Sequence, residues 1–308
     1  MVRKMGIRFL VLLMTVLGMT ACGTSRTVPL TGRTQNLLVS DQEILSLSNQ
    51  EYTNFMKTAR VSTNATQKAM VQRVGTRLAT AVENYLRSHG MAAEVSQFSW
   101  TFNLVQDKSV NAFCMPGGKI VVYEGLLPYT KNEEGLAIVL GHEIAHAVAK
   151  HSAEQISQQY RQAYGTQLVG GVLNAATKSN LGSYAGAVAQ MGFKFQNLKY
   201  SRNHEYEADR MGLIFAAMAG YNPQEAIPFW KRMSASTGNG GGNDFFSDHP
   251  SDEKRIVALQ QHMPEALSYY NQSAKASATS GKAVKSNATP VVSKTIKASQ
   301  LYKQTQKK

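Results

Sequence analysis

Cysteine is scarce in this chain of 308 residues, which contains only two, Cys22 and Cys114. A fold held together by several disulfides is therefore excluded, and we expect Cys114 to be a small buried residue without a disulfide partner. The N-terminal apolar run, residues 9–19, is also too short to span a membrane comfortably. No convincing internal repeat is present, so the central portion of about 230 residues is expected to form one domain.

The N-terminal residues have the pattern of a bacterial export signal, because basic residues precede the apolar run and small residues follow it. The pair Ala21-Cys22 resembles the bacterial lipobox. It predicts a lipoprotein signal peptide at residues 1–22 with the lipid carried by Cys22, followed by a polar tether at 23–39. Since Gly23 is not the aspartate that favours retention in the inner membrane, we expect a lipid anchor in the outer membrane that faces the periplasm.

Acidic residues are fewer than basic ones, 20 against 33, and the formal net charge is +13. The excess is concentrated at the two ends, because the signal and the residues from 271 onward are basic and contain no acid. The rest of the chain is nearly neutral, so the charge is no evidence for nucleic-acid binding, and no nucleic-acid partner is expected. The composition of 266–308 predicts a disordered tail, either solvated or touching anionic lipid or cell-wall polymer.

The most informative residues are His142, Glu143 and His146, which form the pattern HExxH. On a helix, positions four apart lie on one face, so the two imidazoles can bind one zinc ion. Glu143 can hold a water on that zinc and accept its proton. Residues 133–151 are apolar almost all round, which indicates a buried helix whose polar side chains need partners or a metal. The alternative is the polar face of an ordinary helix.

A third zinc ligand has few candidates in this sequence. A metzincin would place a histidine where this chain has Ser152, and His151 is one residue out of register. We therefore interpret His151 as a cation at the end of the helix. A carboxylate ligand has to come from further along the chain, because no acidic residue occurs between Glu154 and Glu205.

The acidic cluster that begins at Glu205 is the first one available. Glu205 and Asp209 are four residues apart and share a helical face. Glu205 can therefore ligate zinc while Asp209 orients a histidine ligand without binding the metal itself. Glu207 lies about 200° around the helix from Glu205, so both cannot face the same ion. The alternative is an acidic helix start on a solvated face.

Further motifs occur in a specific order. Asn111-Ala112-Phe113 and a Pro-Gly-Gly turn precede HExxH; ExxxD, at 205–209, and HPxxxxR, at 249–255, follow it. In this order the chain resembles the gluzincin peptidase family that includes the bacterial HtpX and BepA proteases, the CAAX prenyl proteases and the mitochondrial inner-membrane stress protease. The similarity covers about residues 40–262, and it is greater to the soluble periplasmic BepA-type branch than to the membrane-spanning HtpX branch.

This resemblance implies a helical peptidase core that holds one zinc ion per chain, with Glu205 as the third ligand. It also implies a small strand edge against which an extended substrate lies. Asn111 occupies the position of that edge segment, so it either binds the substrate backbone or is a strand-to-turn asparagine.

The resemblance implies that His249 is a gate that closes over the zinc and regulates access to it. The alternatives are a group that polarises the substrate carbonyl and a cap of the following helix. The glycine-rich loop at 238–243 favours a gate, because it is permissive enough to move. Arg255 is the family's late arginine, expected at the substrate cleft or against Asp209, with a solvated helix position as the alternative.

The predicted fold is mainly α with a small β-sheet (α+β), a gluzincin-like domain at 40–265 with an HExxH helix and a later ExxxD helix. Residues 155–194 are expected to be an interrupted helix that frames the cleft as a lid. Strands are predicted at 98–105 and 119–123, and helices at 41–60, 65–89, 133–151, 201–219, 223–235 and 251–262.

Two functions fit this sequence. The first is a zinc-dependent endopeptidase that hydrolyses misfolded or unassembled cell-envelope proteins, with loose side-chain specificity because strand-edge binding uses the backbone. The alternative is a latched, chaperone-like binding protein that assists the outer-membrane protein assembly machinery. The complete HExxH and ExxxD motifs favour the enzyme. A purely structural zinc is a weaker interpretation, because such sites usually have four ligands rich in cysteine.

Overall fold

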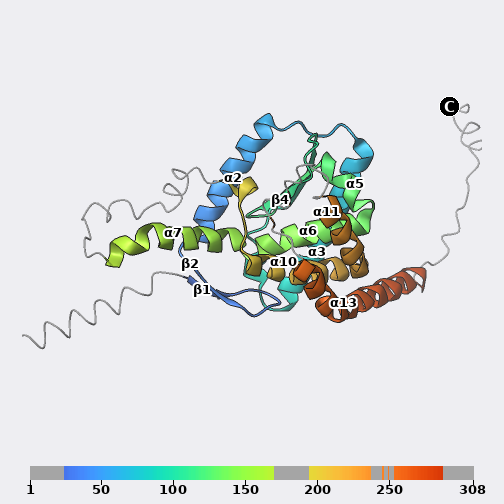
Figure 1. Ribbon diagram of the computed structural model, residues 1–308. Helices are drawn as coiled ribbons and strands as arrows, with labels where there is room; N and C mark the ends of the chain where they lie inside the picture. The colour runs from blue at the N-terminus through green and yellow to red at the C-terminus, as the bar shows by residue number, and fades with distance from the viewer. Residues whose placement is uncertain (1–23, 170–193, 237–244, 246–248, 250–252, 287–308) are drawn as a thin grey trace, which may run out of the picture.

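The computed structural model describes residues 24–169, 194–236, 245, 249 and 253–286. Helices predominate among these residues, and two small β-sheets accompany them (Figure 1). The predicted fold class, mainly α with a small β-sheet, is confirmed. The predicted signal peptide, most of the predicted lid, the loop at 238–243 and the end of the tail lie outside the described residues.

Helix α6, Glu133–Val148, lies at the centre of the molecule (Figure 1). It begins where the Asn132 side chain accepts a hydrogen bond from the Gly135 backbone N–H. Two glutamates in its first turn stabilise the helix further, because their negative charges lie at the positive end of the helix dipole. Almost every residue after this turn is buried, in agreement with the apolar sequence. The predicted helix 133–151 ends early, because Lys150 adopts a φ of 54° and a second helix, α7, His151–Val169, begins there.

Helix α10, Arg202–Met218, packs against α6 at two facing glycines. A Cβ on Gly141 would lie 2.6 Å from the carbonyl oxygen of Gly212, and a Cβ on Gly212 would lie 2.6 Å from the backbone nitrogen of His142. Both distances are far below van der Waals contact, so a larger residue at either position would force the two backbones apart. This approach brings the ExxxD residues of α10 next to the HExxH residues of α6.

A three-stranded sheet lies beside α6, in the order β3-β5-β4. The central strand β5, Lys119–Tyr123, is parallel to β3, Thr101–Val105, and antiparallel to β4, Ala112–Met115. Gly117 and Gly118 form the turn between β4 and β5 with φ values of 82° and 84°, a conformation that favours glycine. The strand β4, which the sequence pattern did not predict, is an edge strand next to the HExxH helix.

The remaining described helices pack into two hydrophobic clusters, one around α6 and α10 and a second that includes buried residues of α2, α7 and the three-stranded sheet. Helix α2 begins with a capping box in which Ser40 and Glu43 bond each other's backbone. The predicted helices 41–60 and 65–89 agree with α2 and α3 to within two residues. These helices and the short turns between them are α2 Asp41–Thr58, α3 Ala65–Ser88, α4 Ala92–Val95, η2 Glu124–Leu126, α5 Leu127–Thr130, η3 Phe195–Asn197, η4 Pro223–Glu225, α11 Ala226–Ser236 and α13 Glu253–Ser286.

Helix α13 continues well past the predicted domain boundary at 265. Ala266 is fully buried, and Tyr269 and Tyr270 pack against the core, so the prediction of a disordered tail from 266 onward is wrong up to Ser286. The alanine-rich composition that favoured disorder also has a high helix propensity, and the tyrosines provide an apolar face.

The predicted tether at 23–39 is also wrong, because residues 24–37 form a β-hairpin. Strand β1, Thr24–Thr27, pairs antiparallel with β2, Thr34–Leu37, near α7 (Figure 1). Arg33 fixes the hairpin to the domain with two hydrogen bonds to Glu154, of 2.8 and 2.7 Å, and one of 2.8 Å to Glu207. The composition of the segment could not reveal this, since the partner carboxylates lie more than 100 residues away along the chain.

Among the helices described, none combines the length and the apolar content that crossing a membrane requires.

The facing glycines make a first prediction. The substitution Gly212→Ala should lower the free energy of unfolding by about 3 kcal/mol, because its Cβ meets backbone rather than a movable side chain. Urea unfolding followed by circular dichroism would measure this. The exposed helical substitution Thr80→Ala is the control and should change little; an unchanged stability in Gly212→Ala would contradict the close approach.

A second prediction concerns the pH dependence of the hairpin's attachment. Burial would raise the pKa of Glu154, but hydrogen bonds from His204 and Arg33 outweigh it and lower the pKa from 4.5 to about 2. The stabilisation by this carboxylate is therefore complete above pH 4.5 and is lost as the pH falls toward 2.

The free energy of unfolding of the wild type should exceed that of Glu154→Gln by about 1–2 kcal/mol near neutral pH, after allowance for partial exposure. This difference should shrink between pH 4.5 and 2, as measured by urea unfolding at a series of pH values. A difference that stays constant over that range would contradict the assignment.

Candidate metal centre

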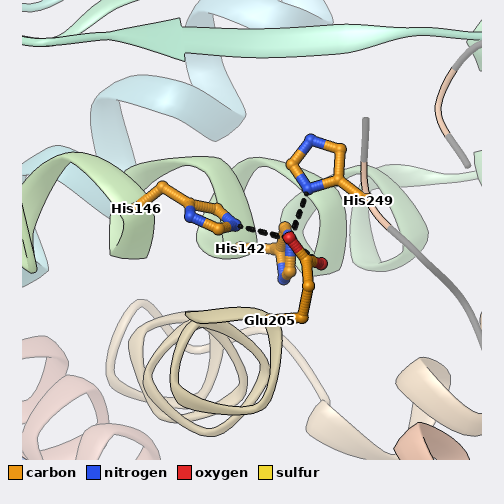
Figure 2. Close-up of side chains that lie close together, drawn as sticks. All are labelled: His142, His146, Glu205 and His249. Atoms are coloured by element: carbon orange, nitrogen blue, oxygen red, sulfur yellow. Dashed lines mark hydrogen bonds and ion pairs between the residues drawn. The ribbon is translucent and has the colours of Figure 1, made fainter. Parts of the chain in front are cut away.

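Four buried side chains converge at one point between α6, α10 and the segment that carries His249. Their ligand atoms, from His142, His146, Glu205 and His249, all lie within 4.8 Å of one another. Figure 2 shows both α6 histidines pointing toward the Glu205 carboxylate, with His249 approaching from a third segment. Each of the four is at most 3% exposed. The structure thus brings together the predicted HExxH histidines, the predicted ExxxD glutamate and His249.

The spacing of these atoms fits a tetrahedral metal site. His142 Nε2 lies 3.1 Å from His146 Nε2 and 3.3 Å from His249 Nδ1, and Glu205 Oε1 lies 3.0 Å from His249 Nδ1 and 3.5 Å from His146 Nε2. A tetrahedron with metal–ligand bonds of about 2.0–2.1 Å has edges of about 3.3–3.4 Å. The four atoms therefore have the mutual distances that zinc ligands need.

The charges around the site also fit a divalent cation. Three buried carboxyl groups, Glu143, Glu205 and Asp209, lie here with one buried guanidinium, Arg255. Buried carboxylates in excess are costly unless a cation compensates them. A dication held between the histidines and Glu205 would provide that compensation.

Asp209 orients the first histidine from the side opposite the site. Its Oδ1 lies 3.0 Å from His142 Nδ1, in ion-pair contact, while His142 Nε2 faces the other ligands. Burial alone would lower the pKa of His142, but Asp209 and Glu205 outweigh it and raise the pKa to about 9. A metal ion would compete with that proton for Nε2.

Arg255 lies against Asp209, which is one of the positions that the sequence allows. It donates two hydrogen bonds of 2.7 Å to the Asp209 carboxylate and pairs with Glu205 Oε2 at 2.9 Å. Only 3% of its surface is exposed, so of the positions that the sequence allows the structure shows the one against Asp209 and not the solvated one. A buried guanidinium needs carboxylates around it, and these two provide them.

His151 does not form the predicted cation at a helix end. The turn at Lys150 places the His151 ring against His146, where its Nδ1 lies 2.9 Å from His146 Nδ1. Its Nε2 lies 2.9 Å from Glu207 Oε2. Burial lowers the pKa of His151 from 6.5 to about 4, so the ring is neutral near pH 7. Glu207 faces His151 and not the metal ligands, in agreement with its predicted place around the helix.

Glu143 lies on α6 between the two histidines and is 2% exposed. The edge strand β4, which carries Cys114, lies beside this helix. Glu143 Oε1 lies 3.5 Å from His249 Nε2 and has no hydrogen-bond partner within the described part of the chain. Burial raises the pKa of Glu143 above its usual value, although His249 and His142 partly oppose this. Cys114 itself is buried and free, as predicted.

Asn111 lies at the start of β4 and is 7% exposed. Its side-chain oxygen accepts a hydrogen bond of 2.8 Å from the backbone N–H of Ala112, and its carbonyl accepts one from Tyr123. These contacts fix the position of Asn111 directly before the edge strand β4. Cys22, the predicted lipidation site, lies outside the described residues.

His249 closes over the site. Phe245 stacks on its ring at 4.6 Å with an interplanar angle of 21°, and the Phe245 backbone N–H donates to the carbonyl of Val110, 3.0 Å away. The position over the ligands agrees with the gate alternative for His249.

Two aromatic residues of the site had no signal in the sequence. Tyr200 stacks on His146, with ring centroids 3.9 Å apart, and its hydroxyl lies 2.9 Å from Ser152 Oγ. Phe245 is fully buried next to His142 and His249. Neither lies in a recognisable motif, because ring stacking between distant segments leaves no local pattern.

The sequences of known proteins agree with this geometry. Residues 65–263 match the family model described as "Peptidase family M48". The mitochondrial metalloendopeptidase OMA1 of Schizosaccharomyces pombe is 39% identical over 173 residues, which are 56% of this chain and 49% of that protein. The human metalloendopeptidase OMA1 is 28% identical over 244 residues, 78% of this chain and 46% of that protein.

A bacterial relative matches as well. The beta-barrel assembly-enhancing protease of Escherichia coli is 28% identical over 180 residues, 56% of this chain and 37% of that protein. The chain thus spans half or less of the length of these three relatives. The match over 65–263 includes the HExxH and ExxxD motifs and the His249–Arg255 segment, and the chain belongs to peptidase family M48.

Proposed function

We propose that this chain is a zinc-dependent endopeptidase in which His142, His146 and Glu205 hold one zinc ion and Glu143 is the general base. The observation that carries the proposal is a single buried point where three metal-ligating side chains meet a carboxylate with an unpaired oxygen. Two imidazoles and one carboxylate are the ligand set of catalytic zinc sites that keep a fourth position open.

Zinc, when bound, would polarise a peptide carbonyl and lower the pKa of a water molecule. Glu143 accepts the proton of the attacking water and later delivers it to the leaving amine. Burial raises the pKa of Glu143, which brings the carboxyl nearer to the range where it can both accept and donate a proton near neutral pH.

An extended polypeptide is the substrate class that suits the site. The edge strand β4 lies next to α6, and a substrate strand added beside it would pass the Glu143 carboxylate. Such binding uses backbone hydrogen bonds, so unfolded segments of varied sequence would be accepted. We assign to Asn111, which directly precedes β4, the role of binding the backbone of the substrate strand.

The proposed substrates are misfolded or unassembled proteins of the bacterial cell envelope. The lipobox-like pattern at Cys22 supports a lipid anchor at the outer membrane, facing the periplasm. The similarity to a beta-barrel assembly-enhancing protease supports a place beside the outer-membrane assembly machinery. The hairpin begins at Thr24, so such an anchor would hold the domain close to the membrane.

The alternative is a latched, chaperone-like binding protein, and one observation favours it. His249 lies 3.0 Å from Glu205 and 3.5 Å from Glu143, where a substrate carbonyl and water would have to lie. With His249 as a fourth ligand the site is closed at rest, and cleavage requires this residue to move away.

Substitution of the base tests the enzymatic function. Zinc-loaded wild-type protein should cleave casein or unfolded porin, and Glu143→Gln should lose this activity by about 10²–10⁴-fold, because the amide cannot accept the proton. Metal analysis should still find one zinc ion per chain in the variant. The exposed substitution Glu253→Gln is the matched control and should retain activity; equal cleavage by wild type and Glu143→Gln would refute the proposal.

Substitution of the gate separates the two functions. His249→Ala should cleave casein faster than the wild type if His249 is a latch, because the fourth position becomes available to substrate. A slower variant would indicate that His249 polarises the carbonyl. Absence of cleavage in both proteins, with zinc bound in each, would favour the chaperone-like alternative.

A further inference from the structure

The N-terminal hairpin is connected to the metal centre by an unbroken chain of polar contacts. Arg33 Nε donates to Glu207 Oε2 over 2.8 Å, and Thr31 Oγ1 donates to Glu207 Oε1 over 2.5 Å. Glu207 Oε2 in turn lies 2.9 Å from His151 Nε2, and His151 Nδ1 lies 2.9 Å from His146 Nδ1. His146 Nε2 then faces the other metal ligands.

We propose that Arg33, Glu207 and His151 are positioning residues that set the tautomer and orientation of the metal ligand His146. The inference rests on the proposed zinc site. It assigns a role to the hairpin at 24–37, which lies outside the region that matches the peptidase family.

The direction of each hydrogen bond follows from what its atoms can donate. The Glu207 carboxylate only accepts, so His151 Nε2 carries the proton between them. A neutral imidazole has one N–H, so His151 Nδ1 is an acceptor. His146 Nδ1 must then donate to it, which leaves the lone pair of His146 on Nε2. That is the atom that faces Glu205 and His142 in Figure 2.

The opposite order of donors would leave His146 unable to bind a metal. If His151 presented a proton from Nδ1, His146 Nδ1 would have to accept it, and a neutral His146 would carry its proton on Nε2, toward the site. The Glu207 carboxylate prevents this by retaining the His151 proton on Nε2. Arg33 and Thr31 donate to the same carboxylate, one to each oxygen, which fixes its orientation toward His151.

The two histidine ligands of α6 are thus supported in parallel ways. His142 Nδ1 lies 3.0 Å from the Asp209 carboxylate, which Arg255 holds. His146 donates through His151 to Glu207, which Arg33 holds. In each case an arginine from a segment distant in the sequence fixes the carboxylate. Outer partners of this kind commonly change metal affinity by about 10–100-fold.

The hairpin also holds the end of α6, only a few residues beyond His146. Gln35 Nε2 donates to the carbonyl of Ala149 over 2.9 Å, and Arg26 donates to that of Val148 over 3.4 Å. Arg26 also pairs with Glu94, but it has no part in the contacts that lead to His146. It therefore offers a control that weakens the same hairpin and leaves these contacts intact.

Zinc affinity is the property to measure, because it requires no cleavage. In the full-length protein, competition with a chromophoric chelator should give a zinc dissociation constant about 10-fold higher for Arg33→Met and about 10–100-fold higher for His151→Leu. Arg26→Met should stay within about 2-fold of the wild type. The cobalt-substituted protein should show altered d–d absorption in the first two variants only, because the ligand field changes when His146 is free to reorient.

A conservative variant distinguishes positioning from a loss of packing. In His151→Asn, the side-chain oxygen can replace Nδ1 as the acceptor for His146, so zinc affinity should largely return relative to His151→Leu. Arg33→Lys keeps a charge next to Glu207 and should lie between the wild type and Arg33→Met. If His151→Leu does not fold, the zinc dissociation constants of Arg33→Met, Arg33→Lys and Arg26→Met still test the positioning role.

Two results would overturn the inference: unchanged zinc affinity in Arg33→Met and His151→Leu, or an equal loss in Arg26→Met. Either can occur while the wild type binds zinc and cleaves protein, so the proposed function would survive. A wild type that binds no zinc would refute the proposed function itself.

Discussion

The close approach of α6 and α10 at Gly141 and Gly212 is the constraint on which the metal centre depends. HExxH supplies two ligands from one helix, and the third has to come from a helix that is separate in the sequence. With glycines at the crossing, the α10 backbone comes near enough for the short side chain of Asp209 to reach His142. The same approach places Glu205 between both histidines.

Burying so many ionisable groups costs free energy, and this explains why each buried carboxylate near the metal centre has cationic or hydrogen-bonding partners. Carboxylates that orient the histidines must remain ionised, and burial alone would raise their pKa. Arg255 opposes that effect at Asp209, and His151 followed by Arg33 opposes it at Glu207, so the pKa of both carboxyls is lowered. The surroundings of the metal centre thus include the N-terminal hairpin as well as the helices of the peptidase region.

The chemistry at the centre was predictable from local patterns. HExxH is defined by spacing on one helix, and the absence of acidic residues between 155 and 204 left Glu205 as the first carboxylate available to it. The buried helix and the α+β class followed from apolar periodicity. The hairpin at 24–37 was not predictable, because its short polar strands are stabilised by carboxylates more than 100 residues away. His151 was misassigned because one turn at Lys150 redirects it, and φ at that residue is not a property of the motif.

The sequence by itself thus determined which residue types could hold a metal and which carboxylate could act as the base, because spacing of three or four residues fixes a helical face. Only the tertiary structure decided that His249 lies over the ligands, that Arg255 is buried against Asp209, and that His151 faces His146. Those contacts join segments that are distant along the chain. Their positions depend on the packing of helices and loops as a whole, which no local pattern encodes.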